Sequence, residues 1–164
     1  QTTSRTYATA LAAYHAINAD GADGVFNITN NYIGGTAANC GSAAMSLSST
    51  STFTPYLFRI FAGNQATTSI SGNTFANMSL TTASTSTTLN TAIGAHSGQI
   101  AINNNTIGSA STAGSITFTG GAASVFSGMY LANGSAATSN YIHSNNKQLS
   151  DDKIMKTFFS DFEL

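Results

Sequence analysis

Charged residues are scarce in this chain. Lys, Arg, Asp and Glu together make up 7% of its 164 residues, against about 25% in an average soluble domain. The net charge is −1 and no basic run occurs, so nothing in the sequence would attract nucleic-acid phosphates or an anionic membrane surface. We therefore expect neither nucleic acid nor a membrane as a partner.

Cysteine, proline and long apolar runs are also rare. Cys40 is the only cysteine, which excludes an internal disulfide and a thiolate metal cluster and predicts a buried thiol. Pro55, the only proline, precedes an expected strand, where a missing N–H matters least. No apolar stretch approaches the roughly 18 residues of a transmembrane helix, so we expect no membrane span.

The middle of the chain lacks the side chains that most polysaccharide lyases and hydrolases use. Between Gly24 and Asn146 there is no Asp, no Glu and one basic residue, Arg59. Such enzymes need clustered carboxylates, usually beside a basic group, and Asp20 and Asp23 share a loop with no further carboxylate nearby in sequence. We therefore expect no enzymatic activity. A polysaccharide-degrading enzyme stays open as an alternative, which Asp20 and Asp23 converging with Arg59 in a groove would favour.

Motifs for metals, nucleophiles and nucleotides are missing as well. His15, His96 and His143 belong to different parts of the repeat described below, and no pair has the spacing of metal ligands. Neither a G-x-S-x-G elbow nor a P-loop lysine occurs. We expect no metal, no cofactor and no catalytic residue.

Ser, Thr, Asn and Gly take the place of the missing charges, and among them one pattern of about ten residues occurs four times. A small or apolar residue stands three places before an Asn, and an apolar residue stands two places after it. The copies are Phe26–Gly35 (FNITNNYIGG), Thr68–Asn77 (TSISGNTFAN), Ile100–Ser109 (IAINNNTIGS) and Ser135–Ser144 (SAATSNYIHS). Their Asn residues are 42, 32 and 35 residues apart, and periods of this length indicate a solenoid.

The two apolar positions of each copy lie five residues apart. Residues five apart point to opposite faces of a straight strand, so both can face one interior only if the chain bends between them. Asn, often beside another Asn or a Gly, suits the bend because it tolerates left-handed backbone angles and bonds locally. Stacked side-chain amides can then bond along the axis. The predicted ladder consists of Asn31, Asn73, Asn105 and Asn140 at the corners, Ile28, Ile70, Ile102 and Ala137 before them, and Ile33, Phe75, Ile107 and Ile142 after them.

Apolar centres at Ile17, Ile60 and Ile93 precede the corner strands by about ten residues, which is a second sign of stacking. The further strands that we expect lie around His15–Ile17, Ala43–Leu47, Tyr56–Ala62, Met78–Thr82, Thr91–Gly94, Ser115–Thr119 and Ser127–Leu131. The predicted fold class is all-β, a right-handed parallel β-helix (solenoid) of about four coils with three strands per coil. It spans residues 1–146, of which 1–13 finish a preceding turn or cap it.

Residues 147–164 differ from the rest because most of the charge lies there. They hold three of the five basic and four of the six acidic residues. Ser150, Asp151 and Asp152 suit a helix start, and Met155 and Phe159 begin an apolar stripe that continues at Phe162. We expect a short, helical C-terminal cap over the open end of the solenoid. A docking segment and a foreign sequence stay open.

The outward positions of the corner strands form the candidate binding surface. They are Thr29, Ser71, Asn103 and Thr138 before the Asn, and Tyr32, Thr74, Thr106 and Tyr141 after it. With coils stacked about 4.8 Å apart, they would form two short ladders on one flat face. Rows of hydroxyl and amide groups with Tyr at the edges suit sugars, and the same flatness could order water, as in ice-binding solenoids. An ordinary solvent-facing surface without a ligand is the simplest alternative.

Three stretches carry a resemblance to a known family: ISGNTF (Ile70–Phe75), INNNTIG (Ile102–Gly108) and SGMYLANGS (Ser127–Ser135). Over roughly Tyr14–Ser144 the chain resembles the pectin-lyase-like right-handed β-helix repeats of large secreted surface proteins of gliding bacteria. The resemblance implies an extracellular, surface-anchored adhesin or filament of the gliding-motility adhesin kind. The chain departs from that group by its shortness and its charged tail, so a whole protein and one module both stay open.

The expected function is a non-catalytic structural or adhesive module of an extracellular surface protein or filament. Exposed strand ends invite end-to-end stacking, so the expected partners are further β-helix repeats or copies of the chain itself. The alternative is a carbohydrate-binding module that uses the outward Thr/Tyr face, with surface glycans as partners. A polysaccharide lyase or hydrolase and an ice-binding protein are the remaining alternatives.

Overall fold

The structure is a computed structural model, and it describes residues 5–7, 13–21, 23–49, 53–83, 90–109, 115–121, 124–131, 135–138 and 141–142. In these residues short β-strands follow one another in repeated rungs. The first rung runs through β2 (Ala13–Tyr14), β3 (Ile17–Asp20), β4 (Asn27–Thr29), β5 (Tyr32–Ile33) and β6 (Met45–Ser49). The second runs through β7 (Thr54–Phe61), β8 (Thr68–Ser71), β9 (Thr74–Phe75) and β10 (Met78–Thr81).

The third rung repeats the order of the second. It runs through β11 (Asn90–Ser97), β12 (Ile100–Asn103), β13 (Thr106–Ile107) and β14 (Ile116–Thr119). A fourth rung contributes β15 (Phe126–Leu131), β16 (Ser135–Thr138) and β17 (Tyr141–Ile142), and β1 (Arg5–Tyr7) precedes the first. The tail 147–164, with its predicted helical cap, lies outside the described residues.

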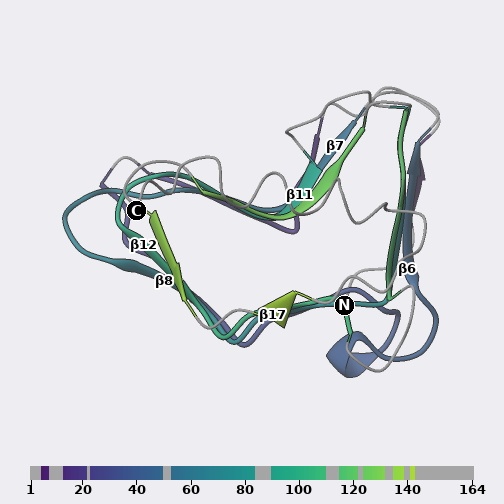
Figure 1. The fold of residues 1–164 in the computed structure, drawn as a ribbon, viewed down its shortest axis with the longest axis horizontal. Helices are drawn as coiled ribbons and strands as arrows, with labels where there is room; N and C mark the ends of the chain where they lie inside the picture. Colours follow the sequence, from purple (N-terminus) through teal and green to yellow (C-terminus); the bar gives the residue numbers. More distant parts are fainter. Residues whose placement is uncertain are drawn as a thin grey trace, which may run out of the picture.

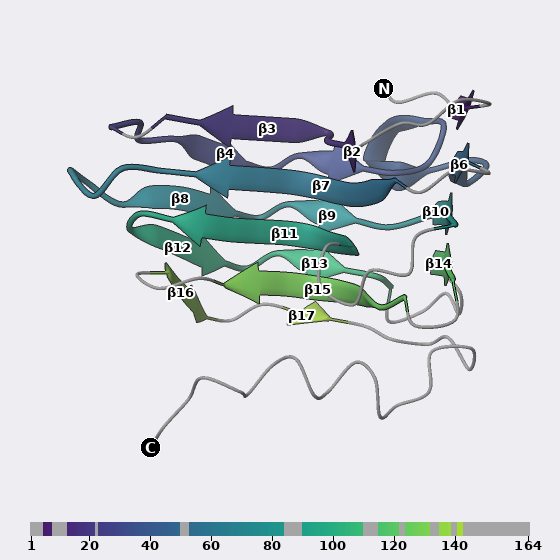
Figure 2. The same cartoon turned by 90° about the horizontal axis from the view of Figure 1, so that it is seen from above.

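Each strand pairs in parallel with the matching strand of the next rung. The described strands form four sheets, with the orders β1-β6-β10-β14, β15-β11-β7-β2 with β3 beside β7, β16-β12-β8-β4, and β17-β13-β9-β5. Figure 2 shows the rungs lying one beside another in sequence order. The view along the stack in Figure 1 shows three sides, one of which is bent between β8 and β9. The prediction of a mostly β chain with parallel strands in repeated rungs is confirmed.

The apolar residues that flank the corners lie one over the next. Ile28 pairs with Ile70, Ile70 with Ile102, and Ile102 with Ala137. After the corner the paired residues are Ile33, Phe75, Ile107 and Ile142, in rung order. Side chains of the first three rungs at these positions are at most 9% exposed, so stacking the rungs removes one apolar column on each side of the corner from water.

At the corner, one residue takes the left-handed backbone conformation and the next makes the hydrogen bonds of the ladder. The sequence did not predict this division. The ladder Asn was expected to take the left-handed conformation, but that is wrong. The residue before it has the positive φ instead: Asn30 (57°), Gly72 (68°) and Asn104 (54°). All three are residue types for which left-handed angles cost little. The ladder Asn therefore keeps its side chain free to bond to neighbouring rungs.

An excursion in the first rung explains the uneven period. Between β5 and β6 the chain makes a loop that holds the 3₁₀ turn η1 (Ala38–Cys40), whereas β9 and β10 are joined directly by Ala76 and Asn77. Asn77 ties this loop down by donating to the main-chain oxygens of Cys40 and Ser42 at 2.9 Å each. Cys40 is buried, and this burial raises the pKa of its thiol, opposed by hydrogen bonds with the backbone of Ala76 and Ile33. The predicted buried thiol is confirmed.

Candidate functional site

The predicted Thr/Tyr face exists as two aligned rows, but they do not share one flat face. Thr29, Ser71, Asn103 and Thr138 pair in order in one sheet, and Tyr32, Thr74, Thr106 and Tyr141 in another. The left-handed residue at each of the three described corners turns the chain between the two sheets, and Figure 1 shows the wall bending outward there. Side chains on the two rows therefore point apart, and the expectation of one flat face is wrong. Tyr32 is 52% exposed; the side chains of Thr138 and Tyr141 lie outside what the structure describes.

The Asn ladder is continuous over three rungs. The main-chain N–H and the Nδ2 of Asn31 both donate to the Oδ1 of Asn73, at 3.0 and 2.9 Å. Asn73 donates in the same way to the Oδ1 of Asn105, at 3.0 and 2.9 Å. Asn73 and Asn105 are 0% exposed, and their Nδ2 groups also donate to the main-chain oxygens of Ile28 and Ile70. Asn140 lies outside the described residues.

A second surface, which the sequence did not predict, lies on the outer side of the sheet β3–β7–β11–β15. Figure 1 shows that the backbone of this wall bends inward near β7 and β11. We call this surface the concave wall, and define it by His15, Asn18, Asp20, Tyr56, Arg59, Phe61, Gly94, His96 and Tyr130. Side chains on either side of an inward bend converge, which the outward bend at the Asn corner does not allow.

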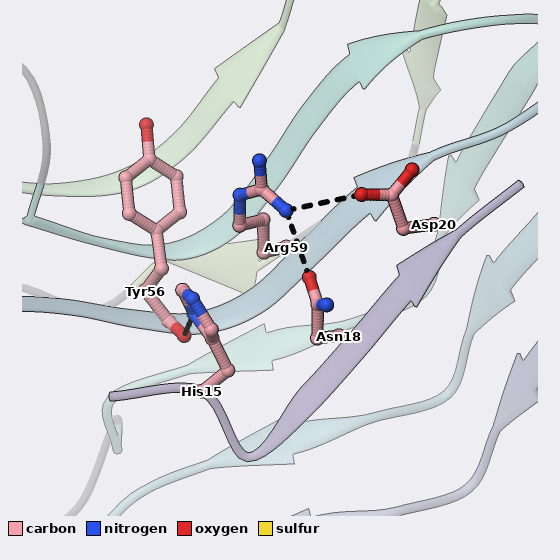
Figure 3. Close-up of polar contacts among 5 residues, drawn as sticks. All are labelled: His15, Asn18, Asp20, Tyr56 and Arg59. Carbon is pink, nitrogen blue, oxygen red and sulfur yellow. Dashed lines mark hydrogen bonds and ion pairs between the residues drawn. The ribbon is translucent and has the colours of Figure 1, made fainter. Parts of the chain in front are cut away.

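One column of the concave wall crosses all four rungs. Asn18 pairs with Arg59, Arg59 with Gly94, and Gly94 with Tyr130. The Nη1 of Arg59 donates to the Oδ1 of Asn18 at 3.0 Å and lies 3.5 Å from the Oδ2 of Asp20. Figure 3 shows the guanidinium between these two partners, with the Tyr56 ring beside it. The side chains of Arg59 and Asp20 are 31% and 58% exposed, so the pair is open to water.

Rings surround this column. The guanidinium carbon of Arg59 lies 4.3 Å from the centre of the Phe61 ring. The His96 ring stacks on Phe61 with centroids 4.6 Å apart and planes 4° apart. His96 also lies 5.2 Å from the rings of both Tyr56 and Tyr130. Aromatic ring pairs contribute about 0.5–1.5 kcal/mol each, and a cation over a ring at an exposed site contributes about 0.5–1 kcal/mol.

Two backbone features place the rings. The register between β7 and β11 shifts between Ala95 and Ser97, so His96 is the extra residue of a β-bulge, a device that re-aims a side chain. Gly94 leaves room for Tyr56, since a Cβ there would overlap a carbon of the Tyr56 ring. From the first rung, the Nδ1 of His15 donates to the main-chain oxygen of Tyr56 at 3.0 Å. The concave wall is therefore fixed by the fold.

Two polar atoms of the concave wall are buried without a hydrogen-bond partner in the described part of the chain. They are the hydroxyl of Tyr56 and the Nε2 of His96. Burial raises the pKa of Tyr56, assisted by Tyr130 and opposed by Arg59. Burial also lowers the pKa of His96, and the charges of Arg59 and His15 lower it further. Both side chains are therefore neutral at pH 7. A buried polar atom without a partner costs about 1–3 kcal/mol and calls for a physical explanation.

The lowered pKa of His96 makes stability depend on pH. The unfolded chain, with an ordinary histidine pKa of about 6.5, binds the proton more readily than the folded chain does. His96 therefore contributes to the free energy of unfolding above that pH. This contribution is lost as the pH falls through the lowered pKa that His96 has in the folded chain. We expect the free energy of unfolding to drop between about pH 7.5 and pH 5.5, and to drop less in the variant His96→Gln. Urea unfolding followed by circular dichroism measures both; equal drops would contradict the assignment.

Carboxylates and histidines that the sequence analysis considered can now be placed relative to the concave wall. Asp20 does reach Arg59, but Asp23 forms no ion pair with any described residue, whereas paired-carboxylate hydrolysis needs two acids on one substrate bond. His15 and His96, expected in unrelated positions, instead flank the same Tyr56 ring.

In the part of the chain that the structure describes, no three His, Cys, Asp or Glu residues group as metal ligands. Nor does any helix there have the length and apolarity to cross a membrane.

Comparison with protein-family models, with curated proteins and with solved structures finds no match to this chain. The function must therefore be argued from the chain's own geometry. One signal in the sequence could have located the concave wall. Once the corner repeat sets the register, the same offsets bring Asn18, Arg59, Gly94 and Tyr130 into one column.

Proposed function

We propose that this chain is a segment of a right-handed parallel β-helix and serves as a non-catalytic structural or adhesive module of an extracellular surface protein or filament. In this proposal the stack of rungs continues into further β-helix repeats or into copies of the chain. The observation that carries the proposal is the edge of the first rung, where strands and ladder stop without a neighbour among the described residues.

The edge consists of β4 and β5. β4 pairs with β8 and β5 with β9, and no other described strand pairs with either. The main-chain oxygen of Phe26 and the N–H of Asn30 bond to β8. Because successive residues of a parallel strand bond to opposite sides, the N–H groups of Asn27 and Thr29 point away from β8. Such an edge is a template for another strand.

The Asn ladder stops at the same edge. The Oδ1 atoms of Asn73 and Asn105 each accept two hydrogen bonds from the rung before. The Oδ1 of Asn31 accepts none from the described residues. A further rung with an Asn at the corner would use this acceptor as the inner rungs do, which supports continuation of the stack. The scarcity of charge supports an extracellular setting, and the likeness to gliding-adhesin repeats supports the adhesive role.

The test is whether the chain assembles through this edge. We expect sedimentation velocity to show oligomers that grow with protein concentration, and electron microscopy to show short rods or fibres. Thr29→Pro removes an N–H that points out of the edge and blocks pairing there. We expect this variant to remain monomeric.

The matched control is Thr29→Ala, which keeps the N–H and should assemble as the parent does. We expect both variants to fold, because Thr29 is exposed and its N–H bonds to no neighbouring described strand. Thermal melting followed by circular dichroism verifies this. A parent that stays monomeric at every concentration would contradict self-assembly. So would a folded Thr29→Pro variant that assembles as readily as the parent.

A further inference from the structure

We propose that the concave wall binds a neutral oligosaccharide, with one sugar ring packed against Tyr130 and His96 and its hydroxyl groups bonded by Arg59, Asn18 and Asp20. This site lies on a different sheet from the Thr/Tyr rows considered above. The inference does not rest on assembly of the chain, since the concave wall is formed within one copy.

The first argument is shape. A sugar needs contacts from more than one direction, and the inward bend of the backbone at the concave wall (Figure 1) turns the side chains of its two arms toward each other. Rings from three rungs meet there: Tyr56 and Phe61 from β7, His96 from β11 and Tyr130 from β15. The Thr/Tyr rows lie on an outward bend, so a ligand there would touch one row at a time.

The second argument is the pairing of apolar and polar surface. Tyr130 is 36% exposed, which offers a ring face to the C–H groups of a sugar, in keeping with the electron-rich faces of aromatic rings. In the same column, Arg59 uses its Nη1 to bond to Asn18 and Asp20, and no other guanidinium nitrogen bonds to a described residue. The remaining guanidinium donors, the Asp20 carboxylate and the Asn18 amide present fixed donors and acceptors side by side (Figure 3). Such a fork suits two neighbouring hydroxyl groups.

The third argument is charge. Arg59 is the only basic residue from Thr6 to Asn146, and Asp20 balances it at 3.5 Å. Tyr56 and His96 are neutral near pH 7 because of their burial. A neutral polyol therefore matches the site better than an anion or a cation, which would each meet an already compensated charge.

The fourth argument is the pair of unpartnered polar atoms. Tyr56 is 95% buried, since 5% of its surface is exposed. Neither its hydroxyl nor the Nε2 of His96 has a hydrogen-bond partner among the residues that the structure describes. Both atoms can donate or accept a hydrogen bond. Both atoms are closed to solvent, so a sugar hydroxyl reaches them when a side chain of the concave wall shifts on binding, and the new hydrogen bond then recovers the free energy that leaving them unbonded costs. Packing alone gives no reason to place two such atoms beneath one concave surface.

The experiment screens the full chain against immobilised neutral hexasaccharides of glucose (β-1,4 and β-1,3), xylose and mannose, with oligogalacturonate as the acidic comparison. Isothermal titration calorimetry then gives Kd for the hexasaccharides retained. We expect binding of at least one neutral hexasaccharide, stronger than that of oligogalacturonate. Tyr130→Ala and Arg59→Gln should each raise Kd at least about tenfold.

Tyr32→Ala is the matched control, since it removes an exposed Tyr from the other face and should leave Kd unchanged. Unchanged melting temperatures verify that the three variants fold. The inference is overturned if no neutral hexasaccharide binds, or if Tyr32→Ala abolishes binding while Tyr130→Ala and Arg59→Gln retain it. Its failure is distinct from failure of the proposed assembly, because sedimentation of the unliganded chain is measured separately.

Discussion

Replacing Asn73 by Leu is expected to lower the free energy of unfolding by about 3–5 kcal/mol. Leu has nearly the same volume but no amide. The change takes a partner from the N–H of Asn31 and from the main-chain oxygen of Ile28, and it does so at a position that is 0% exposed. Since domains of this size are stable by about 5–15 kcal/mol, urea unfolding followed by far-ultraviolet circular dichroism should detect the loss easily.

Asn31→Leu provides the matched control for this prediction. Asn31 stands at the end of the ladder and is partly exposed. Its own backbone N–H still donates to Asn73 after the change, so only the Nδ2 bonds disappear. We expect a loss of about 1 kcal/mol. Equal losses in the two variants would mean that the ladder amides do not depend on one another for their partners.

Replacing Phe58 by Ala is the second change with a large expected effect, about 3–5 kcal/mol. Phe58 of β7 and Phe75 of β9 are both 0% exposed. Their rings meet edge to face, with centroids 4.7 Å apart and planes at 71°. This contact joins the inner side of the concave wall to the strand beyond the Asn corner, and Ala would leave a cavity between the two walls. Thermal and urea unfolding measure the cost.

Phe58→Leu separates loss of volume from loss of the ring. Leu fills most of the space and should cost less than half as much as Ala, on the order of 1–1.5 kcal/mol. If Phe58→Ala were as stable as Phe58→Leu, the interior would have collapsed around the smaller side chain. That result would contradict a rigid contact between the two walls.

The rungs and their register could be predicted from the sequence because a small set of apolar and Asn positions fixes them. Five residues between two buried positions require a bend, and the recurrence of that spacing aligned Ile28, Ile70 and Ile102 correctly. The resulting columns follow from stacking, which acts on each repeat in the same way. Positions that differ from rung to rung carry no such signal.

The concave wall could not be predicted because it depends on deviations from the repeat. Its inward bend, the bulge at His96 and the space over Gly94 each occur once, whereas periodicity reports only what recurs. The flat Thr/Tyr face failed for a related reason. Alternation along a strand predicts which residues point outward. It does not predict that Asn30, Gly72 and Asn104 turn the chain between the two rows.

The Asn ladder has a direction. In the described rungs the Oδ1 atoms of Asn73 and Asn105 accept from the rung before, and the Nδ2 groups of Asn31 and Asn73 donate to the rung after, so the amide dipoles of the column add rather than cancel. Along the described column, the side that faces earlier rungs presents amide oxygens and the side that faces later rungs presents amide nitrogens. Two copies that met through identical ends would oppose oxygen to oxygen, so association through this column must be head to tail. A head-to-tail contact does not close into a symmetric dimer, and repeated addition yields a polar, open-ended polymer.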